Sequence, residues 1–273
     1  MTSPILVTGG TGTLGRHVVP LLREAGHDLR VLSRHPHKPE NGVGFVAGDL
    51  LEGEGVEAAV DGIDTVVHLA GGPKGDDDAT RNLARAASRA RVQHMLYISV
   101  IGADRVPVRW LQSKLGAERA IADSGVPWTI LRAAQFHDLA LTVVQKMAKL
   151  PVVPVPGGLR FQPVDSREVA ARLVELTLDR PAGRVADLAG PTVYAMGDLV
   201  RGYLQARGKH RLMMPVRLPG KAGRAYRAGD NLNLRAARGT RTWEEFLAER
   251  VPSTGEDPAR DHAAAWSGDS RRT

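Results

Sequence analysis

Short apolar runs alternate with longer amphipathic segments over the first half of the chain. Apolar runs that end in glycine or polar residues predict buried strands within residues 3–10, 28–34, 42–50, 62–71, 94–104 and 127–136. Apolar residues at helical spacing predict helices within residues 13–27, 79–92 and 111–125, the first of them with Gly26 as a C-cap. Strands that alternate with helices predict an α/β fold with a parallel sheet covered on both faces. With right-handed crossovers this is a doubly wound sheet of the Rossmann type.

The pattern changes after residue 150. Residues 150–165 are rich in Pro and Gly and predict an irregular excursion, whereas residues 166–181 predict an amphipathic helix with Ser166 as N-cap and Glu168 in its first turn. A further strand, a helix and an extended segment are expected within residues 183–191, 196–208 and 211–220. We therefore expect a cofactor-binding core over residues 1–150, a smaller C-terminal substrate lobe over residues 151–251 that interleaves with the last core elements, and a disordered tail over residues 252–273.

Composition excludes several classes of protein. The 273 residues are 42% hydrophobic and 25% charged, which is normal for a globular protein. The chain has 0 Cys, which excludes disulfides, thiolate catalysis and cysteine-bound metals, and no metal is expected. No apolar run approaches the roughly 18 residues of a membrane span, and the start of the chain has too short an apolar run for a signal peptide. We expect a cytoplasmic protein with no membrane partner.

The formal net charge is +7, which raises the question of nucleic acid as a partner. Basic residues are interleaved with acidic ones along the chain, and aromatic residues that could stack on bases are only 4%. The charge therefore favours a solvated basic surface over nucleic-acid binding. A basic cleft would also suit a phosphorylated cofactor.

A glycine-rich turn joins the first predicted strand to the first predicted helix. Gly10-x-Gly12-x-x-Gly15 matches the dinucleotide fingerprint, and Gly9 precedes it. Such glycines permit a tight turn, let the backbone approach a pyrophosphate, and allow close packing of the helix. Backbone N–H groups and the helix dipole would face the phosphates. The loop residues expected to bind the cofactor are Gly9, Gly10, Thr11, Gly12, Thr13, Leu14 and Gly15.

The end of the second strand predicts which nicotinamide cofactor binds. An NAD-binding protein commonly places Asp or Glu there to bind the ribose 2′-hydroxyl. This chain has Ser33 and Arg34 instead, with no carboxylate before Glu40. A guanidinium pairs with a 2′-phosphate, so NADP(H) is the expected cofactor.

Two further strand ends complete the expected cofactor site. Asp49 would accept a hydrogen bond from the adenine amino group, with Leu50 beside the ring. After the fourth strand, small residues would leave room for the cofactor's sugar and diphosphate. The expected contacts there are Leu69, Ala70 and Gly71. His68 lies inside that strand and is expected to be a core histidine.

These motifs together resemble a known family. The segments TGGTGTLG, AGDL, LYISVIGAD and PWTILRAAQFHD, with the helix that carries Lys114, are similar to atypical short-chain dehydrogenases of the NmrA-like NAD(P)H-binding group. The similarity continues through RFQPVD, VADLAGP and TWEEFLAER. It implies NADP binding and a substrate lobe in the C-terminal third, for members that range from active reductases to regulators without catalysis.

In enzymes of this kind a tyrosine acts as general acid, and a lysine four residues later lowers its pKa and holds the nicotinamide ribose. Lys114 matches the lysine, but Trp110 stands in place of the tyrosine. An indole N–H donates a hydrogen bond but does not titrate usefully near neutral pH. Ser99 matches a serine that polarises the substrate carbonyl, and Tyr97 is expected to lie in the core.

Two routes to catalysis remain open without the tyrosine. Hydride transfer to an enone or quinone would place the new charge on a distant oxygen, which solvent or another donor would protonate. Alternatively His137, after the sixth strand, would donate the proton, with Gln135 and Phe136 lining the same pocket as Trp110. The chain is thus expected to be an NADP(H)-dependent reductase of a small carbonyl, enone or quinone compound. The alternatives are a noncatalytic NADP(H) sensor that acts on a protein partner, and an isomerase or cyclase that retains the cofactor.

Overall fold

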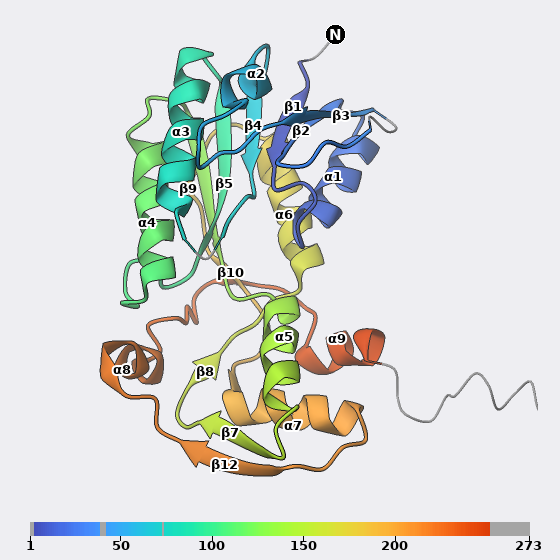
Figure 1. Ribbon diagram of the computed structural model, residues 1–273, viewed down its shortest axis with the longest axis vertical. Helices are drawn as coiled ribbons and strands as arrows, with labels where there is room; N and C mark the ends of the chain where they lie inside the picture. Colours follow the sequence, from blue (N-terminus) through green and yellow to red (C-terminus); the bar gives the residue numbers. More distant parts are fainter. Residues whose placement is uncertain (1–2, 39–41, 73, 252–273) are drawn as a thin grey trace, which may run out of the picture.

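A computed structural model describes residues 3–38, 42–72 and 74–251 of the chain. The described residues form two lobes, one above the other (Figure 1). The upper lobe is a sheet with helices on both faces, and the lower lobe is built mainly from the C-terminal half of the chain. The tail expected over residues 252–273 and Glu40 lie outside the described residues.

The central sheet of the upper lobe is parallel. Its main strands are β1 (Ile5–Thr8), β2 (Leu29–Ser33), β3 (Val43–Ala47), β4 (Thr65–His68), β5 (His94–Val100) and β6 (Trp128–Ala133). Three short strands return to it late in the chain: β9 (Gly183–Arg184), β10 (Leu188–Ala189) and β13 (Ala237–Arg238). The order is β13-β10-β6-β5-β4-β1-β2-β3, with β9 paired to β6. The order reverses between β1 and β4, so the crevice that binds ligands in such sheets lies there. The doubly wound Rossmann-type sheet predicted from the sequence is confirmed.

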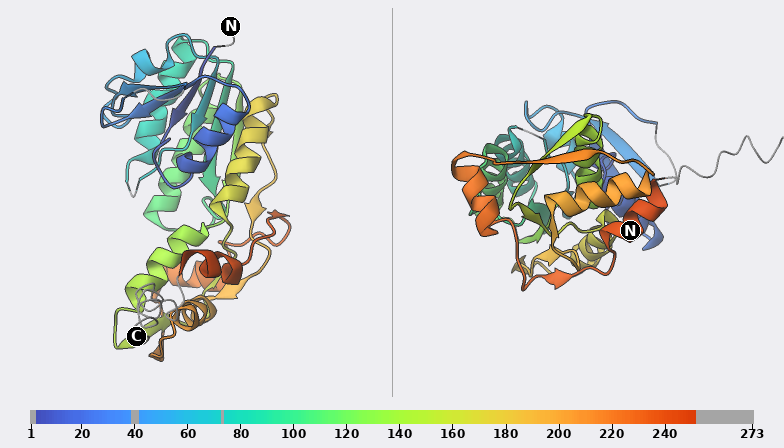
Figure 2. Two further views of the ribbon diagram at one scale, coloured as in Figure 1. Left: turned by 90° about the vertical axis from the view of Figure 1, so that its right-hand side faces the viewer. Right: turned by 90° about the horizontal axis from the view of Figure 1, so that it is seen from below.

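Helices cover the two faces of this sheet, as Figures 1 and 2 show. One face packs against α2 (Val56–Val60), α3 (Asp76–Arg89) and α4 (Arg109–Ala122). The other packs against α1 (Gly15–Glu24) and α6 (Ser166–Leu178). Aliphatic residues on both sides of each strand enter these two cores, which explains the nearly continuous apolar runs in the sequence.

The lower lobe has its own core. Its elements are α5 (His137–Met147), β7 (Val152–Pro156), β8 (Arg160–Phe161), β11 (Tyr194–Ala195), α7 (Met196–Ala206), β12 (Leu212–Val216), α8 (Gly220–Ala228) and α9 (Trp243–Arg250). Val144, Val153, Trp243 and Phe246 are among its buried residues. Because α5 packs against α7 and not on the sheet, the second lobe begins before residue 150.

Two local details differ from the sequence predictions. Asp165, and not Ser166, caps α6, because its carboxylate accepts the backbone N–H of Arg167 at 2.8 Å. Residues 152–156 are not irregular, since β7 pairs in parallel with β12. Glu168 does lie in the first turn of α6. Among the described residues, no helix is long and apolar enough to cross a membrane.

Candidate active site

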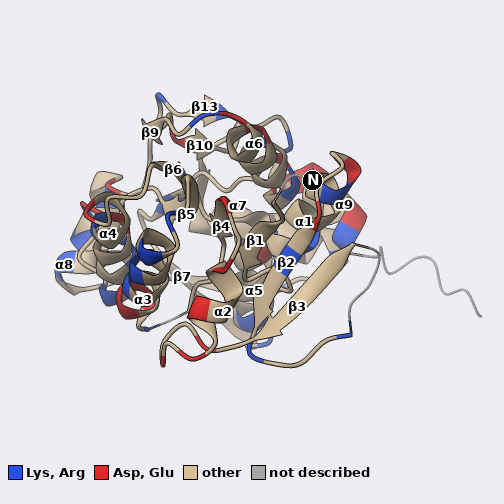
Figure 3. Ribbon diagram, turned by 90° about the horizontal axis from the view of Figure 1, so that it is seen from above, with Lys and Arg blue, Asp and Glu red and all other residues tan. Residues whose placement is uncertain are grey.

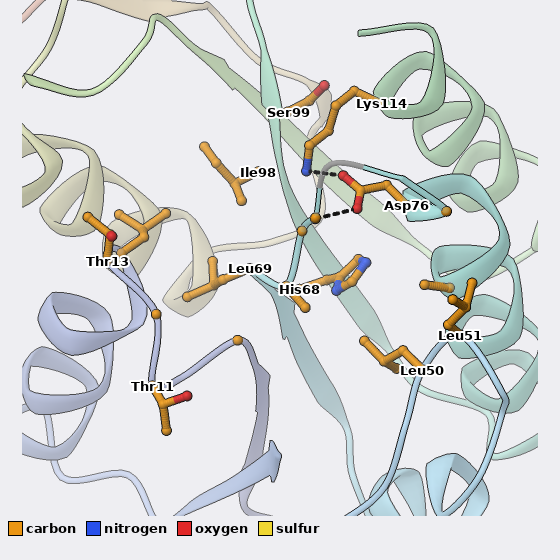
Figure 4. A pocket seen from close by; sticks show the side chains of 18 of the residues that line it. Thr11, Thr13, Leu50, Leu51, His68, Leu69, Asp76, Ile98, Ser99 and Lys114 are labelled. Carbon is orange, nitrogen blue, oxygen red and sulfur yellow. Dashed lines mark hydrogen bonds and ion pairs between the residues drawn. The ribbon is translucent and has the colours of Figure 1, made fainter. Parts of the chain in front are cut away.

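A cavity of about 720 Å³ opens at the carboxyl ends of the sheet strands, between the two lobes. Its wall includes the glycine-rich turn, the ends of β2 to β6, and residues from α4 and the start of α5. Figure 4 shows part of this wall. The predicted site residues that line it are Gly9, Thr11, Gly12, Thr13, Leu14, Ser33, Arg34, Asp49, Leu50, Leu69, Ala70, Gly71, Ser99, Trp110, Lys114, Gln135 and Phe136. Gly10 and Gly15 lie beneath the turn, outside the lining.

Two glycines of the turn, Gly9 and Gly15, are required for steric reasons. Gly9 has φ of +70°, and a Cβ there would lie 2.6 Å from the backbone nitrogen of Ala70. A Cβ on Gly15, the first residue of α1, would lie 2.3 Å from the carbonyl oxygen of Gly9. The N–H groups of Arg16 and His17 donate to the carbonyl oxygens of Gly12 and Leu14, at 3.0 and 2.9 Å, so a phosphate would be bound by the positive end of the α1 dipole and by N–H groups earlier in the turn. The turn therefore has the form that a dinucleotide requires.

The far end of the cavity carries polar and basic groups. Arg34 is exposed beside Ser33, whose hydroxyl accepts a hydrogen bond from the backbone N–H of His35 at 3.2 Å. Asp49 accepts the N–H of Leu51 at 2.8 Å through one carboxylate oxygen, which fixes the side chain and leaves the other oxygen for a ligand. This end has groups suited to a phosphate and an amino group.

β4 ends in a buried histidine, His68, whose two ring nitrogens both have hydrogen-bond partners inside the protein. The ring nitrogens of His68 lie 2.6 Å from the Thr8 hydroxyl and 2.9 Å from the Thr80 hydroxyl. Burial, with a smaller effect of the nearby Lys114 charge, lowers the pKa of His68 to about 3. The ring therefore stays neutral near pH 7, and the prediction of a core histidine is confirmed.

Lys114 reaches the cavity from α4 and pairs with Asp76, the first residue of α3. Nζ lies 3.0 Å from Oδ2, and the two side chains are 7% and 6% exposed. The other carboxylate oxygen of Asp76 accepts the N–H of Gly72 at 2.6 Å (Figure 4). A Cβ on Gly71 would lie 2.8 Å from Nζ, so the glycine makes room for the ammonium. Asp76 was not among the residues predicted from the sequence, because acidic residues at a helix start are common without any functional role.

Ser99 lines the cavity, but its hydroxyl already donates a hydrogen bond within the protein. The hydroxyl donates a short hydrogen bond to Glu118. Glu118 also accepts two hydrogen bonds from Arg132, at 2.8 and 2.7 Å, and Arg132 reaches Asp104 at 2.8 Å. These contacts raise the pKa of Arg132 and keep the group charged, although burial opposes this. Ser99 is thus part of a buried ionic network, which does not support its expected role of polarising a substrate carbonyl.

Trp110, one helical turn before Lys114 on α4, and Gln135, two residues after β6, both line the cavity. Trp110 is half-buried and packs in a cluster with Val100, Val108 and Tyr226. Gln135 has both amide atoms buried with no hydrogen-bond partner among the described residues. An unpartnered buried amide is costly, so this one suits a polar ligand group.

His137 does not line the cavity. It is fully buried in the lower lobe, with ring centroids 5.8 Å from Trp243 and 5.1 Å from Phe246. Burial lowers its pKa, against the opposing effect of nearby carboxylates, of which Asp165 is the strongest. This placement does not support His137 as the proton donor.

None of the described residues that line the cavity is a tyrosine. Tyr97 is fully buried in the core beneath Lys114, whose Nζ lies 5.2 Å from the ring centroid. Burial, followed by the nearby carboxylates, raises the pKa of Tyr97 well above its ordinary value. The prediction that Tyr97 belongs to the core is confirmed. No group of three or more potential ligand side chains that could hold a metal ion occurs in the described ranges.

The sheet order, the glycine turn and the cavity at the strand ends define a dinucleotide-binding α/β protein. A family model described as NAD(P)H-binding matches residues 9–179, and the chain belongs to this family. The family predicted from the sequence motifs is thereby confirmed.

Two curated relatives carry enzyme names. A (4-alkanoyl-5-oxo-2,5-dihydrofuran-3-yl)methyl phosphate reductase of Streptomyces griseus is 32% identical over 194 residues, which cover 68% of each chain. An NAD(P)H azoreductase of Xenophilus azovorans is 30% identical over 215 residues, covering 75% of this chain and 74% of that one.

Solved structures share the fold. An NADPH-dependent quinone oxidoreductase from Escherichia coli superposes with a TM-score of 0.75 at 20% identity, covering 90% of this chain and 99% of the other. A triphenylmethane reductase from Citrobacter sp., complexed with NADP(H), gives 0.75 at 21% identity, covering 91% and 99%. At these identities the likeness concerns the fold alone.

Proposed function

We propose that the protein is an NADPH-dependent reductase of small conjugated compounds, such as enones and quinones. The observation that carries this proposal is the chemical composition of the cavity wall. The wall offers an indole, an amide and an ion pair, but no phenol among the described lining residues.

Residues of this chain would hold the cofactor along the whole cavity. Backbone N–H groups of the glycine-rich turn and the positive end of the α1 dipole would bind the diphosphate, and Arg34 would pair with the 2′-phosphate that distinguishes NADP(H). Lys114, positioned by Asp76, would donate a hydrogen bond to the nicotinamide ribose. The bound reduced nicotinamide supplies a hydride, which is the chemistry that the protein itself cannot provide.

The proton donors available in the cavity indicate which class of substrate would accept the hydride. Reduction of a simple ketone needs a proton at the carbonyl oxygen as the hydride arrives, and a tyrosine does this in related enzymes. Here Ser99 donates to Glu118, and Lys114 is paired with Asp76. A conjugated acceptor spreads its new charge over several atoms, so solvent can protonate it later. The flat face of Trp110 and the free amide of Gln135 would bind such a molecule by stacking and by one hydrogen bond.

The names of the relatives agree with this class of acceptor. The Streptomyces enzyme name describes a ring double bond conjugated to two carbonyl groups, and the Xenophilus name describes an azo bond. Both are electron-poor double bonds that accept hydride without a carbonyl protonation step. The cytoplasmic location stays a prediction.

Steady-state oxidation of NADPH with a panel of quinones, enones and simple ketones tests the proposal. Turnover with the conjugated members and little with the ketones is the expected result. Tight NADPH binding without turnover of any acceptor would contradict the proposal and favour the noncatalytic sensor. Conversion of an acceptor without net NADPH consumption would favour the isomerase.

A further inference from the structure

The chain's excess positive charge is concentrated at one end of the molecule. Residues 139–164 contain three Lys or Arg and residues 199–229 contain eight, and neither segment contains Asp or Glu. The whole chain has 37 Lys and Arg against 30 Asp and Glu, so the rest has 26 against 30. The even spread of charge expected from the sequence therefore does not hold in these two segments, although α9 of the same lobe carries Glu244, Glu245 and Glu249.

Both segments build the lower lobe and not the sheet. They supply most of α5 and of α7, together with β7, β8, β12 and α8, and β7 and β12 lie at the end of the molecule farthest from the N-terminus (Figure 1). Seen from the opposite end, basic and acidic residues are interspersed over the helices of the upper lobe (Figure 3). The molecule is thus electrically polarised along its long axis.

The sheet formed by β7 and β12 is apolar on both of its faces. The inner face contributes Val153, which is fully buried, and Met213 to the core of the lower lobe. Leu212 and Met214 alternate with Met213, so they point outward, where they are 71% and 51% exposed. Leu212 pairs in register with Val152, which is 37% exposed. A two-stranded sheet on a protein surface normally presents polar residues to water, so this outer face is an exposed apolar surface with no partner within residues 3–38, 42–72 and 74–251.

Exposed cations flank the two strands along the chain. Arg211 immediately precedes β12 and Lys209 lies two residues earlier, Arg217 immediately follows β12, and Lys146 and Lys149 precede β7 on the chain. All five are exposed. Exposed aliphatic side chains flanked by Lys and Arg are a combination that binds an anionic lipid surface, because apolar groups enter the headgroup region while the cations meet lipid phosphates.

We propose that the outer face of β7 and β12, with these flanking cations, docks the protein on an anionic lipid bilayer. A second copy of the chain is a poorer occupant, since a two-fold contact would bring two sets of cations together. Nucleic acid is a poorer occupant too, because exposed aliphatic side chains give bases no stacking surface. The expectation of no membrane partner rested on the lack of a spanning segment, which does not bear on surface binding. The proposal is independent of the proposed reductase activity.

Vesicle co-sedimentation of the full chain tests the docking surface. The protein should bind vesicles of phosphatidylglycerol and phosphatidylcholine, release at high salt, and not bind vesicles of phosphatidylcholine alone. Each basic residue near an anionic surface contributes about fivefold to binding, so Lys209→Gln with Arg211→Gln should weaken it about tenfold or more. Leu212→Ser with Met214→Ser should weaken it to a similar extent.

Matched control variants distinguish binding through this surface from nonspecific binding through charged or apolar residues elsewhere on the protein. Arg23→Gln with Arg119→Gln removes two exposed cations from the upper lobe, and Leu178→Ser with Leu234→Ser removes two aliphatic side chains that are 47% and 61% exposed. Both controls should bind anionic vesicles as the unchanged protein does. A thermal unfolding scan of each variant checks that it folds.

Several results would overturn the proposal. These are no binding to anionic vesicles, equal binding by the β12 variants and their controls, or a dimer in solution that the Leu212→Ser and Met214→Ser changes dissociate. Binding to a short duplex DNA as tight as binding to vesicles would also overturn it, in favour of a general polyanion site.

Discussion

Lys114 and Asp76 form a buried ion pair on the cavity wall, with 3.0 Å between Nζ and Oδ2. Asp76 also accepts the N–H of Gly72 at 2.6 Å, so one carboxylate joins the α4 lysine to the loop that follows β4. The pair fixes the ammonium where the strand ends meet. The ion pair restricts the rotamers of the otherwise flexible Lys114 side chain, so its ammonium becomes a positioned hydrogen-bond donor.

Removing one member of this pair should affect stability and cofactor binding separately. Lys114→Met leaves the Asp76 carboxylate buried without its cation, which should lower the free energy of unfolding by about 3 kcal/mol. Adding Asp76→Asn removes that charge and should restore much of the stability, but not the affinity for NADPH. Denaturant titration and calorimetry measure the two effects. A double variant that binds NADPH as tightly as the unchanged protein would show that Lys114 does not contact the cofactor.

Arg34→Ala should weaken NADPH selectively. A charge-assisted contact to a phosphate is worth about 1.5–3 kcal/mol, so NADPH affinity should fall at least about tenfold while NADH affinity stays the same. Arg119→Ala, which removes an exposed arginine from the far end of α4, should change neither affinity. Equal affinities of the unchanged protein for both cofactors would contradict the assignment of NADP(H).

Ser99→Ala should leave turnover largely intact. The hydroxyl donates to Glu118, which keeps both hydrogen bonds from Arg132, so the expected loss is about 1 kcal/mol of stability. If Ser99 instead polarised the substrate in the reaction, kcat would fall by roughly a hundredfold or more. Steady-state rates with a quinone, compared with the unfolding midpoint, separate the two roles.

Trp110→Tyr should change the choice of acceptor. The phenol would stand one helical turn before Lys114 and restore a titratable donor. NADPH binding should be unchanged, and the ratio of ketone to quinone reduction should rise. Trp110→Phe is the matched control, because it keeps an aromatic wall without a proton to give. A ratio that rises equally in both variants would refute the role assigned to the indole.

His137→Phe should make folding stability less dependent on pH. Burial lowers the pKa of His137 below its ordinary value of 6.5, so the unfolded chain takes up a proton more readily than the folded one. Stability is therefore full above pH 6.5 and falls as the pH drops below it, by at most about 1.4 kcal/mol per pH unit for one histidine. Phenylalanine fits beside Trp243 and Phe246 and removes this penalty.

Unfolding in denaturant at neutral and mildly acidic pH measures that effect. His210→Gln, an exposed change in the lower lobe, should leave the pH dependence as it is. An unchanged slope for His137→Phe would show that His137 is not protonated on unfolding in this range.

The sequence predicts the upper lobe well because its information is local. Glycines at the first strand end, and apolar runs alternating with amphipathic helices, each depend on residues close together in the chain. The pairing of β7 with β12 escapes prediction, since it joins segments about sixty residues apart and its Pro-rich sequence resembles a loop.

The candidate catalytic residues show the same limit. Motif position correctly brings Lys114, Ser99 and Trp110 to one cavity. It does not reveal that Lys114 pairs with Asp76, or that Ser99 donates its hydrogen bond to Glu118. Both acids lie on helices, and in the sequence they resemble ordinary surface charges. His137 follows a strand end, where ligands bind, but the first turn of α5 points it into the lower core.

Single-turnover mixing of the NADPH complex with a quinone, and separately with an enone, tests the central claim most directly. The protein should oxidise one NADPH for each acceptor reduced. The rate should stay nearly constant between about pH 6 and pH 9, because no histidine or tyrosine donates the proton. No oxidation of bound NADPH by either acceptor would contradict the account, and so would a rate that follows the titration of a single side chain.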